Sequence, residues 1–241
     1  MSFAAVVRPV IDRIHVSLRL VSRESAKALY ASRGLQPGLE LDMFYALLDH
    51  PVPEAAAAAR MTYLDFDPAG EADRGVVELS GGAWHLTGTG RELALALDAV
   101  FGETAERLWS YRPSSAMSGL EAAEAAAELI GRVLAAGQAT GGPAFVGLTP
   151  VWEAPGAGPA QRLVPRLEAL RHHRADAHRA AWRAEGLTVE AIQTMAPGPQ
   201  RDAIEDETNR RDEPIYACLS DAERLQLLGA LGALPDGLQD R

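Results

Sequence analysis

The stretch DRGVVELSGGAWHLTGTGRELALAL, residues 73–97, gives the most specific indication of the fold in this sequence. Residues 76–79 and 83–86 are typical of two short strands, and the two glycines from Gly81 are typical of the turn of a tight hairpin. Thr87 follows at the position of a helix N-cap, before a run of apolar residues at helical spacing. The sequence therefore predicts a β-hairpin that leads directly into an amphipathic helix.

Helices are expected before the hairpin. Apolar residues recur at helical spacing through residues 3–33, and Gly34 is a typical helix stop, so this segment predicts one long helix. Residues 40–49 and 53–64 predict two shorter helices, separated by prolines that disfavour the α conformation.

A further helix and a connector are expected after the hairpin. Ser118 and Glu121 have the spacing of a capping box and predict a helix that runs to about Ala136. Residues 137–160 contain ten glycines or prolines, so we expect an irregular connector. Its apolar residues predict that it packs onto the body of the protein.

Two segments carry resemblances to known families. The order helix, helix, helix, hairpin, helix over about residues 35–98, with LTGTGREL at its end, resembles the winged-helix domain of MarR-like proteins. The motifs LEALRHHRADAHRAAWRAEGL and DEPIYACLSDAERL, within about residues 140–232, resemble a largely uncharacterised actinobacterial family of tandem helix-turn-helix proteins. The second resemblance implies a fold and no established reaction.

An internal repeat agrees with tandem units. SRESAKALYASRGL (22–35) aligns with RADAHRAAWRAEGL (174–187), and HLTGTGREL resembles CLSDAERL further along. We therefore expect a mainly α protein with a small β-hairpin wing, built from tandem winged-helix-type units. The expected parts are a first unit (1–110), a linking helix with the Gly/Pro-rich connector (111–160), and a second unit with a reduced wing (161–241). The long helix of the first unit, residues 10–33, is expected to pack against residues 171–182.

Composition excludes several classes of function. The 241 residues include 33 acidic and 23 basic side chains, so the formal charge is −10 and the protein repels a phosphate backbone unless positive charge is clustered. A single cysteine, Cys218, excludes an intrachain disulfide and a cysteine-rich zinc site, which predicts a cytoplasmic protein. No apolar run is long enough for a membrane helix, so no membrane partner is expected.

The stretch RHHRADAHRAAW, residues 171–182, is the main candidate for a site. Arg174 continues an apolar helical stripe, and His178 lies one turn beyond it on the same face. The first copy of the repeat has serine and alanine at these positions, so the fold does not demand the two charged side chains. We expect Arg171, Arg174, His178 and Trp182 to bind a small, anionic molecule.

Two other interpretations of this helix remain open. In an enzyme, His178 would act as acid or base, with Asp176 as its orienting partner. Alternatively the helix is a solvated face, on which carboxylates of the first unit bind Arg174 and His178. His173 and His178 are five residues apart, which does not fit a metal site on one helix face, so no metal is expected.

The remaining polar residues are expected to be structural. His15 is expected in the core or on the surface, Cys218 is expected to be a small buried thiol, and the acidic run at 201–213 a solvated face.

The sequence favours a winged-helix-type protein that binds a small molecule in the cleft between its units and has a regulatory role. Expected DNA contact is weak at most, because candidate recognition segments such as PEAAAAARMTYL are poor in basic residues. A DNA-binding regulator and an enzyme are the alternatives. The ligand, any cofactor and the oligomeric state are left open.

Overall fold

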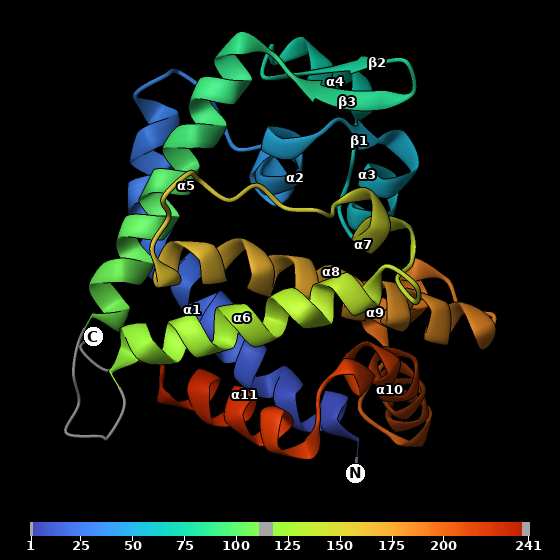
Figure 1. Cartoon of the computed structure of the whole chain (residues 1–241). Coiled ribbons are helices and arrows are strands. Elements are labelled where there is room, and N and C mark those ends of the chain that lie inside the picture. The colour runs from blue at the N-terminus through green and yellow to red at the C-terminus, as the bar shows by residue number, and fades with distance from the viewer. Residues whose placement is uncertain (1, 111–117, 238–241) are drawn as a thin grey trace.

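The computed structural model describes residues 2–110 and 118–237 and is mainly helical, with a small antiparallel sheet (Figure 1). The α-helices of this part of the chain are α1 (Phe3–Ala31), α2 (Phe44–Asp49), α3 (Glu54–Arg60), α4 (Pro68–Asp73), α5 (Gly88–Trp109), α6 (Gly119–Gly137), α7 (Pro143–Gly147), α8 (Pro159–Ala184), α9 (Val189–Thr194), α10 (Pro199–Asp212) and α11 (Asp221–Ala233). The 3₁₀ turns are η1 (Leu39–Asp42) and η2 (Glu213–Cys218), and the strands are β1 (Val52–Pro53), β2 (Val77–Ser80) and β3 (Ala83–Leu86).

The predicted hairpin is confirmed. Strands β2 and β3 pair antiparallel, with Val77 opposite Leu86, and β1 pairs with the other edge of β3. Gly81 and Gly82 have φ values of +60° and +76°. A two-residue turn with positive φ at both positions matches the twist of the strands, and glycine adopts it without strain.

The junction between the hairpin and α5 is also as predicted. The Thr87 side chain accepts a hydrogen bond from the Gly90 amide at 3.0 Å and donates one to the Gly75 carbonyl at 2.8 Å. A Cβ atom at Gly90 would lie 1.9 Å from the Val76 carbonyl oxygen, so only glycine allows α5 to start this close to β2. The N-cap therefore fixes the angle between the sheet and α5.

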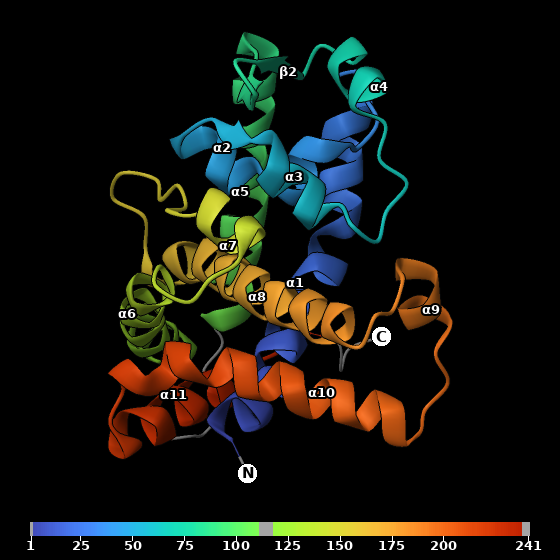
Figure 2. The same ribbon diagram turned by 90° about the vertical axis from the view of Figure 1, so that its right-hand side faces the viewer.

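One continuous core runs through the described chain, from Ala4 to Leu234, and includes residues of α1, α5, α6, α8 and α11. A small second cluster at the α8–α9–α10 corner consists of Ala181, Trp182, Ile192 and Ile204. Figure 2 shows α8 running between α3 and α10. The three expected parts thus share a core, and their division stays a prediction. The start of the linking part, residues 111–117, lies outside the described residues.

The expectation of a wholly irregular connector is wrong, because residues 143–147 form α7. Pro143 is suited to the first position of a helix, since its missing N–H would have no partner there. The Asp176 carboxylate accepts a hydrogen bond from the Phe145 amide at 2.7 Å, so α8 supplies the cap that the local sequence lacks. Phe145 and Leu148 are buried, which confirms that the connector packs onto the body.

The repeated motif has the same local structure in both copies. The amide of Leu35 donates to the carbonyl of Tyr30, and the amide of Leu187 donates to that of Trp182, each at 3.1 Å. The intervening glycines have φ values of +66° and +70°. This is a common way of ending a helix, so it accounts for the sequence match whether or not the units are duplicates. The described part of residues 161–241 contains no strand.

Of two surface expectations, one is wrong and one holds in part. Cys218 is exposed, because it lies in the turn η2 whose buried side chains are Ile215 and Tyr216. The acidic run at 201–213 is solvated only in part: Thr208 and Asp212 face inward and are buried. Within residues 2–110 and 118–237, none of the helices combines the length and apolar character needed to span a membrane.

Candidate functional site

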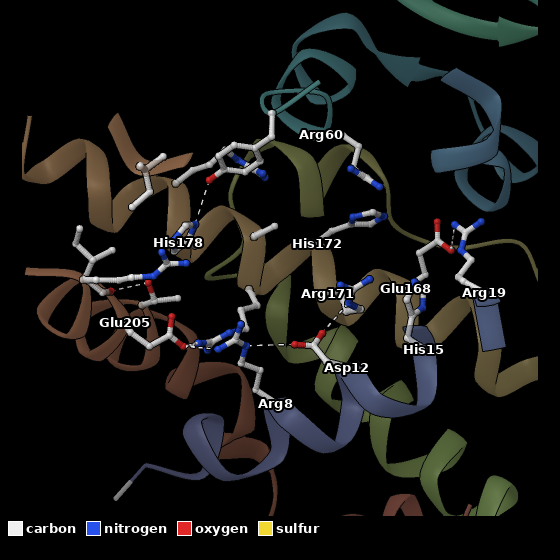
Figure 3. A pocket seen from close by; sticks show the side chains of 18 residues that line it. Arg8, Asp12, His15, Arg19, Arg60, Glu168, Arg171, His172, His178 and Glu205 are labelled. Atoms are coloured by element: carbon white, nitrogen blue, oxygen red, sulfur yellow. Dashed lines mark hydrogen bonds and ion pairs between the residues drawn. The ribbon is translucent and has the colours of Figure 1, made fainter. Parts of the chain in front are cut away.

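A cavity of about 360 Å³ lies where α1, α3, α8, α9 and α10 meet (Figure 3). Its size is within the range of small-molecule sites. Charged and polar side chains dominate its wall. The lining residues are Arg8, Asp12, His15, Arg19, Arg60, Tyr63, Glu168, Arg171, His172, Arg174, Ala175, His178, Arg179, Ile192, Arg201, Ile204, Glu205 and Thr208.

Two helix faces form the long walls. Helix α1 contributes residues 8, 12, 15 and 19, whose spacing of four, three and four places them on one face. Helix α8 contributes residues from Glu168 to Arg179, a length of about 16 Å at 1.5 Å per residue. Figure 3 places His178 and Glu205 at one end of the cavity and Arg19 and Glu168 at the other. The cavity therefore suits an elongated molecule.

Arginines are the most frequent charged residues of the wall. Seven arginines and three carboxylates line the cavity, in a chain whose formal charge is −10. Three further carboxylates behind the wall, Asp42, Asp176 and Asp212, bind Arg60, Arg179 and Arg174. Most of the arginines are therefore paired, and among the described residues Arg201 has no carboxylate partner.

Two carboxylates at the α1 side hold several arginines. Asp12 lies 3.2 Å from Arg8 and 2.9 Å from Arg171. Glu205 binds both Arg8, at 2.7 Å, and Arg174. Arg8 is common to both carboxylates, so Asp12 and Glu205 together bind three guanidinium groups.

Arg174 also reaches a buried carboxylate in α10. Its Nη1 lies 3.4 Å from Asp212 Oδ2, while Asp212 Oδ1 lies 2.7 Å from His173 Nδ1. The prediction that the first unit would supply carboxylates for Arg174 and His178 is therefore wrong: those of Arg174 come from α10. Because Asp212 is buried, Arg174 has a structural role in addition to lining the cavity.

His178 belongs to a hydrogen-bonded chain with two aromatic side chains. Trp182 Nε1 donates to the Tyr63 hydroxyl at 2.8 Å, and that hydroxyl lies 3.0 Å from His178 Nδ1. Since Trp182 can only donate, the Tyr63 hydroxyl is free to donate its own hydrogen to His178. Burial lowers the pKa of His178; Glu205 opposes the shift and Arg174 adds to it.

His15 and His172 line the end of the cavity near Arg60. Each is about 6% exposed, and neither has a hydrogen bond to any described residue. Arg60 donates to Asp42 at 2.6 Å, while its Nε is buried without a partner. Figure 3 shows the Arg60 guanidinium above the His172 ring. The two imidazoles therefore line the cavity without a protein partner, whereas the Arg60 guanidinium has Asp42.

The predicted orienting contact from Asp176 to His178 is absent among the described residues. Asp176 is buried on the α7 side of α8, where it accepts hydrogen bonds from the Phe145 amide and, at 2.6 Å, from Arg179. The carboxylate therefore stabilises the fold next to the cavity and does not line it.

The structure brings three of the predicted ligand-binding residues, Arg171, Arg174 and His178, into one cavity. Trp182 lies behind Tyr63 and reaches the cavity only through that hydroxyl. The interpretation of residues 171–182 as a solvated face is wrong for His172 and Arg179, which are buried. The expected packing of this helix on α1 is present where α1 crosses it, and ion pairs such as Arg171–Asp12 contribute to the contact.

Sequence reasoning missed the residues of α1, α3 and α10. A signal was present in α1, where Arg8, Asp12, His15 and Arg19 form a polar stripe at helical spacing on a helix with a buried apolar face. Tyr63 and Glu205 carried no local signal. No group of three or more metal-ligating side chains with suitable placement occurs in the described parts of the chain.

Comparison of the chain with protein-family models, with curated proteins and with solved structures gives no match.

Proposed function

We propose that the protein binds a small anionic molecule in the cavity between α1, α3, α8 and α10. The observation that carries this proposal is that seven arginines gather around one partly open cavity, with Arg201 left without a carboxylate partner among the described residues. Guanidinium groups bind carboxylates and phosphates through several parallel hydrogen bonds. The neighbouring acids stabilise the empty site, and an anion would compete with them for the guanidinium N–H groups.

A winged-helix-type regulator is the wider role that we propose for this binding. The hairpin and α5, the strongest part of the resemblance to MarR-like domains, follow α2 and α3 in the chain. Direct DNA readout has little support. The candidate recognition segment PEAAAAARMTYL contains α3, whose single arginine, Arg60, pairs with Asp42. Ligand binding therefore has more support than base recognition.

An acid–base reaction at His178 has less support than binding. The Tyr63 hydrogen bond gives the imidazole a defined orientation, but the described residues place no carboxylate against its other nitrogen. Catalysis by the same cavity is kept as the second candidate function.

The test is ligand-dependent thermal unfolding. Inorganic phosphate, citrate, phenyl phosphate and 4-phenylbutyrate are the probes, at equal ionic strength, with 4-phenylbutanamide as the neutral control. A bound anion raises the melting temperature as its concentration exceeds the dissociation constant. We expect at least one anion to stabilise the wild type, and Arg171→Gln to remove most of the effect.

Arg183→Gln is the matched control, because Arg183 lies on the same helix, is exposed and does not line the cavity. It should respond like the wild type. Arg171 is chosen over Arg174 because its partner Asp12 also forms an ion pair with Arg8. Asp12 therefore still has a partner in Arg171→Gln, and the free protein should lose little stability. If no anion stabilises the wild type, or if Arg171→Gln keeps the full response, the proposal is wrong.

A further inference from the structure

The inner end of the cavity contains hydrogen-bonding groups without partners. His15 and His172 have no hydrogen bond to the described residues, and Arg60 Nε is buried and unpaired. Buried polar groups in native proteins almost always have a partner, and each unpaired one costs free energy. Arg60 Nε is such a group, and the two imidazoles line the cavity without a protein partner, so a ligand in the cavity could bind them.

The chemistry of these groups selects an acceptor. Arg60 Nε–H can only donate, and an imidazole donates through one nitrogen when neutral and through both when protonated. A ligand oxygen that accepts from all three groups satisfies them together. Water would accept these bonds as well, but an oxyanion accepts them as charge-assisted hydrogen bonds, which are stronger than neutral ones.

Charged groups from three helices face the imidazole pair: Asp12 and Arg19 from α1, Arg60 from α3, and Glu168, Arg171 and Arg179 from α8. Burial lowers the pKa of His15 and of His172 well below its usual value, and neighbouring arginines lower both further. Both rings are therefore neutral near pH 7. An anion beside them would favour the imidazolium form, because an opposite charge within a few ångströms raises the pKa of a base.

The other end of the cavity is partly apolar. Ile192, Ile204 and the ring of Tyr63 line it, next to the small cluster that contains Trp182. An anionic head group at the histidine end thus leaves the body of a long ligand against these side chains, along the face of α8. These apolar side chains lie among charged ones, since Glu205 with its partners Arg8 and Arg174 lines the same end.

We propose that His15, His172 and Arg60 bind the carboxylate or phosphoryl head of an elongated organic anion, and that the imidazole pair takes up a proton when the head group binds. This inference rests on the function proposed above, and it names the ligand class and the coupling to protons. The proton comes from the buffer and is shared by the pair as one unit, since the two rings interact.

Calorimetric titration of the wild type tests the coupling. Phenyl phosphate and 4-phenylbutyrate are titrated at pH 7 in two buffers that differ in ionisation enthalpy, and inorganic phosphate serves as the probe without an apolar body. We expect an uptake of about one proton per bound organic anion. Inorganic phosphate should bind at least tenfold more weakly, because it lacks contact with the apolar end.

The double variant His15→Gln, His172→Gln keeps hydrogen-bonding groups that cannot be protonated. We expect it to lose the proton uptake and to bind the organic probes about tenfold more weakly, since charge-assisted hydrogen bonds become neutral ones. His85→Asn, on the wing and outside the cavity, is the control and should keep both properties. If the double variant does not fold, the histidine resonances of the wild type, recorded with and without probe, report the protonation directly.

The outcomes separate this inference from the proposed function. Suppose that an anion binds and that Arg171→Gln abolishes this binding. If the wild type then takes up no proton, or if the double variant takes up as much as the wild type, the head-group subsite is wrong and the anion site stands. Unchanged histidine resonances in the presence of bound probe have the same meaning. Absence of binding by every anion overturns both.

Discussion

Tyr63 connects two residues that the sequence picked out, His178 and Trp182, although it is more than a hundred positions away from either. Helical periodicity predicts which residues of one helix share a face, so Arg171, Arg174 and His178 could be found from the sequence. It does not predict which other helix supplies the opposite wall. Asp176 is a second example, because its carboxylate caps α7, a helix that the local sequence does not predict.

The buried histidines make a prediction about stability and pH. The folded-state pKa values of His15 and His172 lie below the unfolded value of about 6.5, so the unfolded chain binds more protons below that pH. Stability is therefore complete above about pH 6.5 and is lost as the pH falls, by up to about 1.4 kcal/mol per pH unit for each histidine until its folded pKa is reached.

Urea unfolding of the wild type and of the His15→Gln, His172→Gln variant at pH 7.5, 6.5 and 5.5 checks this prediction. The variant should lose less stability over the acid range than the wild type does. Equal losses in the two proteins would assign the pH dependence to other groups.

At the scale of elements, the hairpin and the helices that bury an apolar stripe were predictable, while the shortest elements were not. Turn glycines, the Thr87 cap and the Ser118 capping box act over a few neighbouring residues, so the sequence contains all that they need. Helices α4 and α7 have six and five residues. Helices of this length have no stability of their own, and contacts with other elements determine whether they form.

The junction between β2 and α5 gives the prediction at this scale. Gly90→Ala places a methyl group on the Val76 carbonyl, and the strand or the helix must move, which we expect to cost about 1–3 kcal/mol in the free energy of unfolding. Gly88→Ala is the matched control, since a Cβ atom there meets nothing within 4 Å and alanine favours a helix. In urea unfolding, Gly90→Ala should be less stable than the wild type, and Gly88→Ala should be as stable as the wild type or more so. The reverse order would contradict the close contact between Gly90 and the Val76 carbonyl.

At the scale of the whole molecule, the arginines of α8 other than the exposed Arg183 form ion pairs with carboxylates. Arg162 pairs with Glu124 of α6, Arg166 pairs with Glu153 of the connector, and Arg171 pairs with Asp12 of α1. The sequence indicated a basic helix that could contact a phosphate backbone. The fold uses much of that charge internally, which composition along one helix could not reveal.

We therefore predict very weak DNA binding. With a formal charge of −10 and paired arginines, the protein should bind duplex DNA with a Kd no tighter than about 10 µM at physiological salt, and the remaining affinity should fall steeply with salt. Fluorescence anisotropy with labelled duplexes of mixed sequence, at low and at physiological salt, measures the Kd and its dependence on salt. Sub-micromolar, sequence-specific binding would contradict the prediction.

Helix α1 connects the wall of the cavity to the region of the hairpin. Its 29 residues span about 43 Å; residues 8–19 form one wall of the cavity, while Tyr30 at the far end donates to Glu40 at 2.8 Å. Glu40 in turn binds Arg74 at 2.7 Å, three residues before the hairpin strand β2. One helix therefore connects the cavity wall to the segment before the hairpin through the contacts Tyr30–Glu40 and Glu40–Arg74.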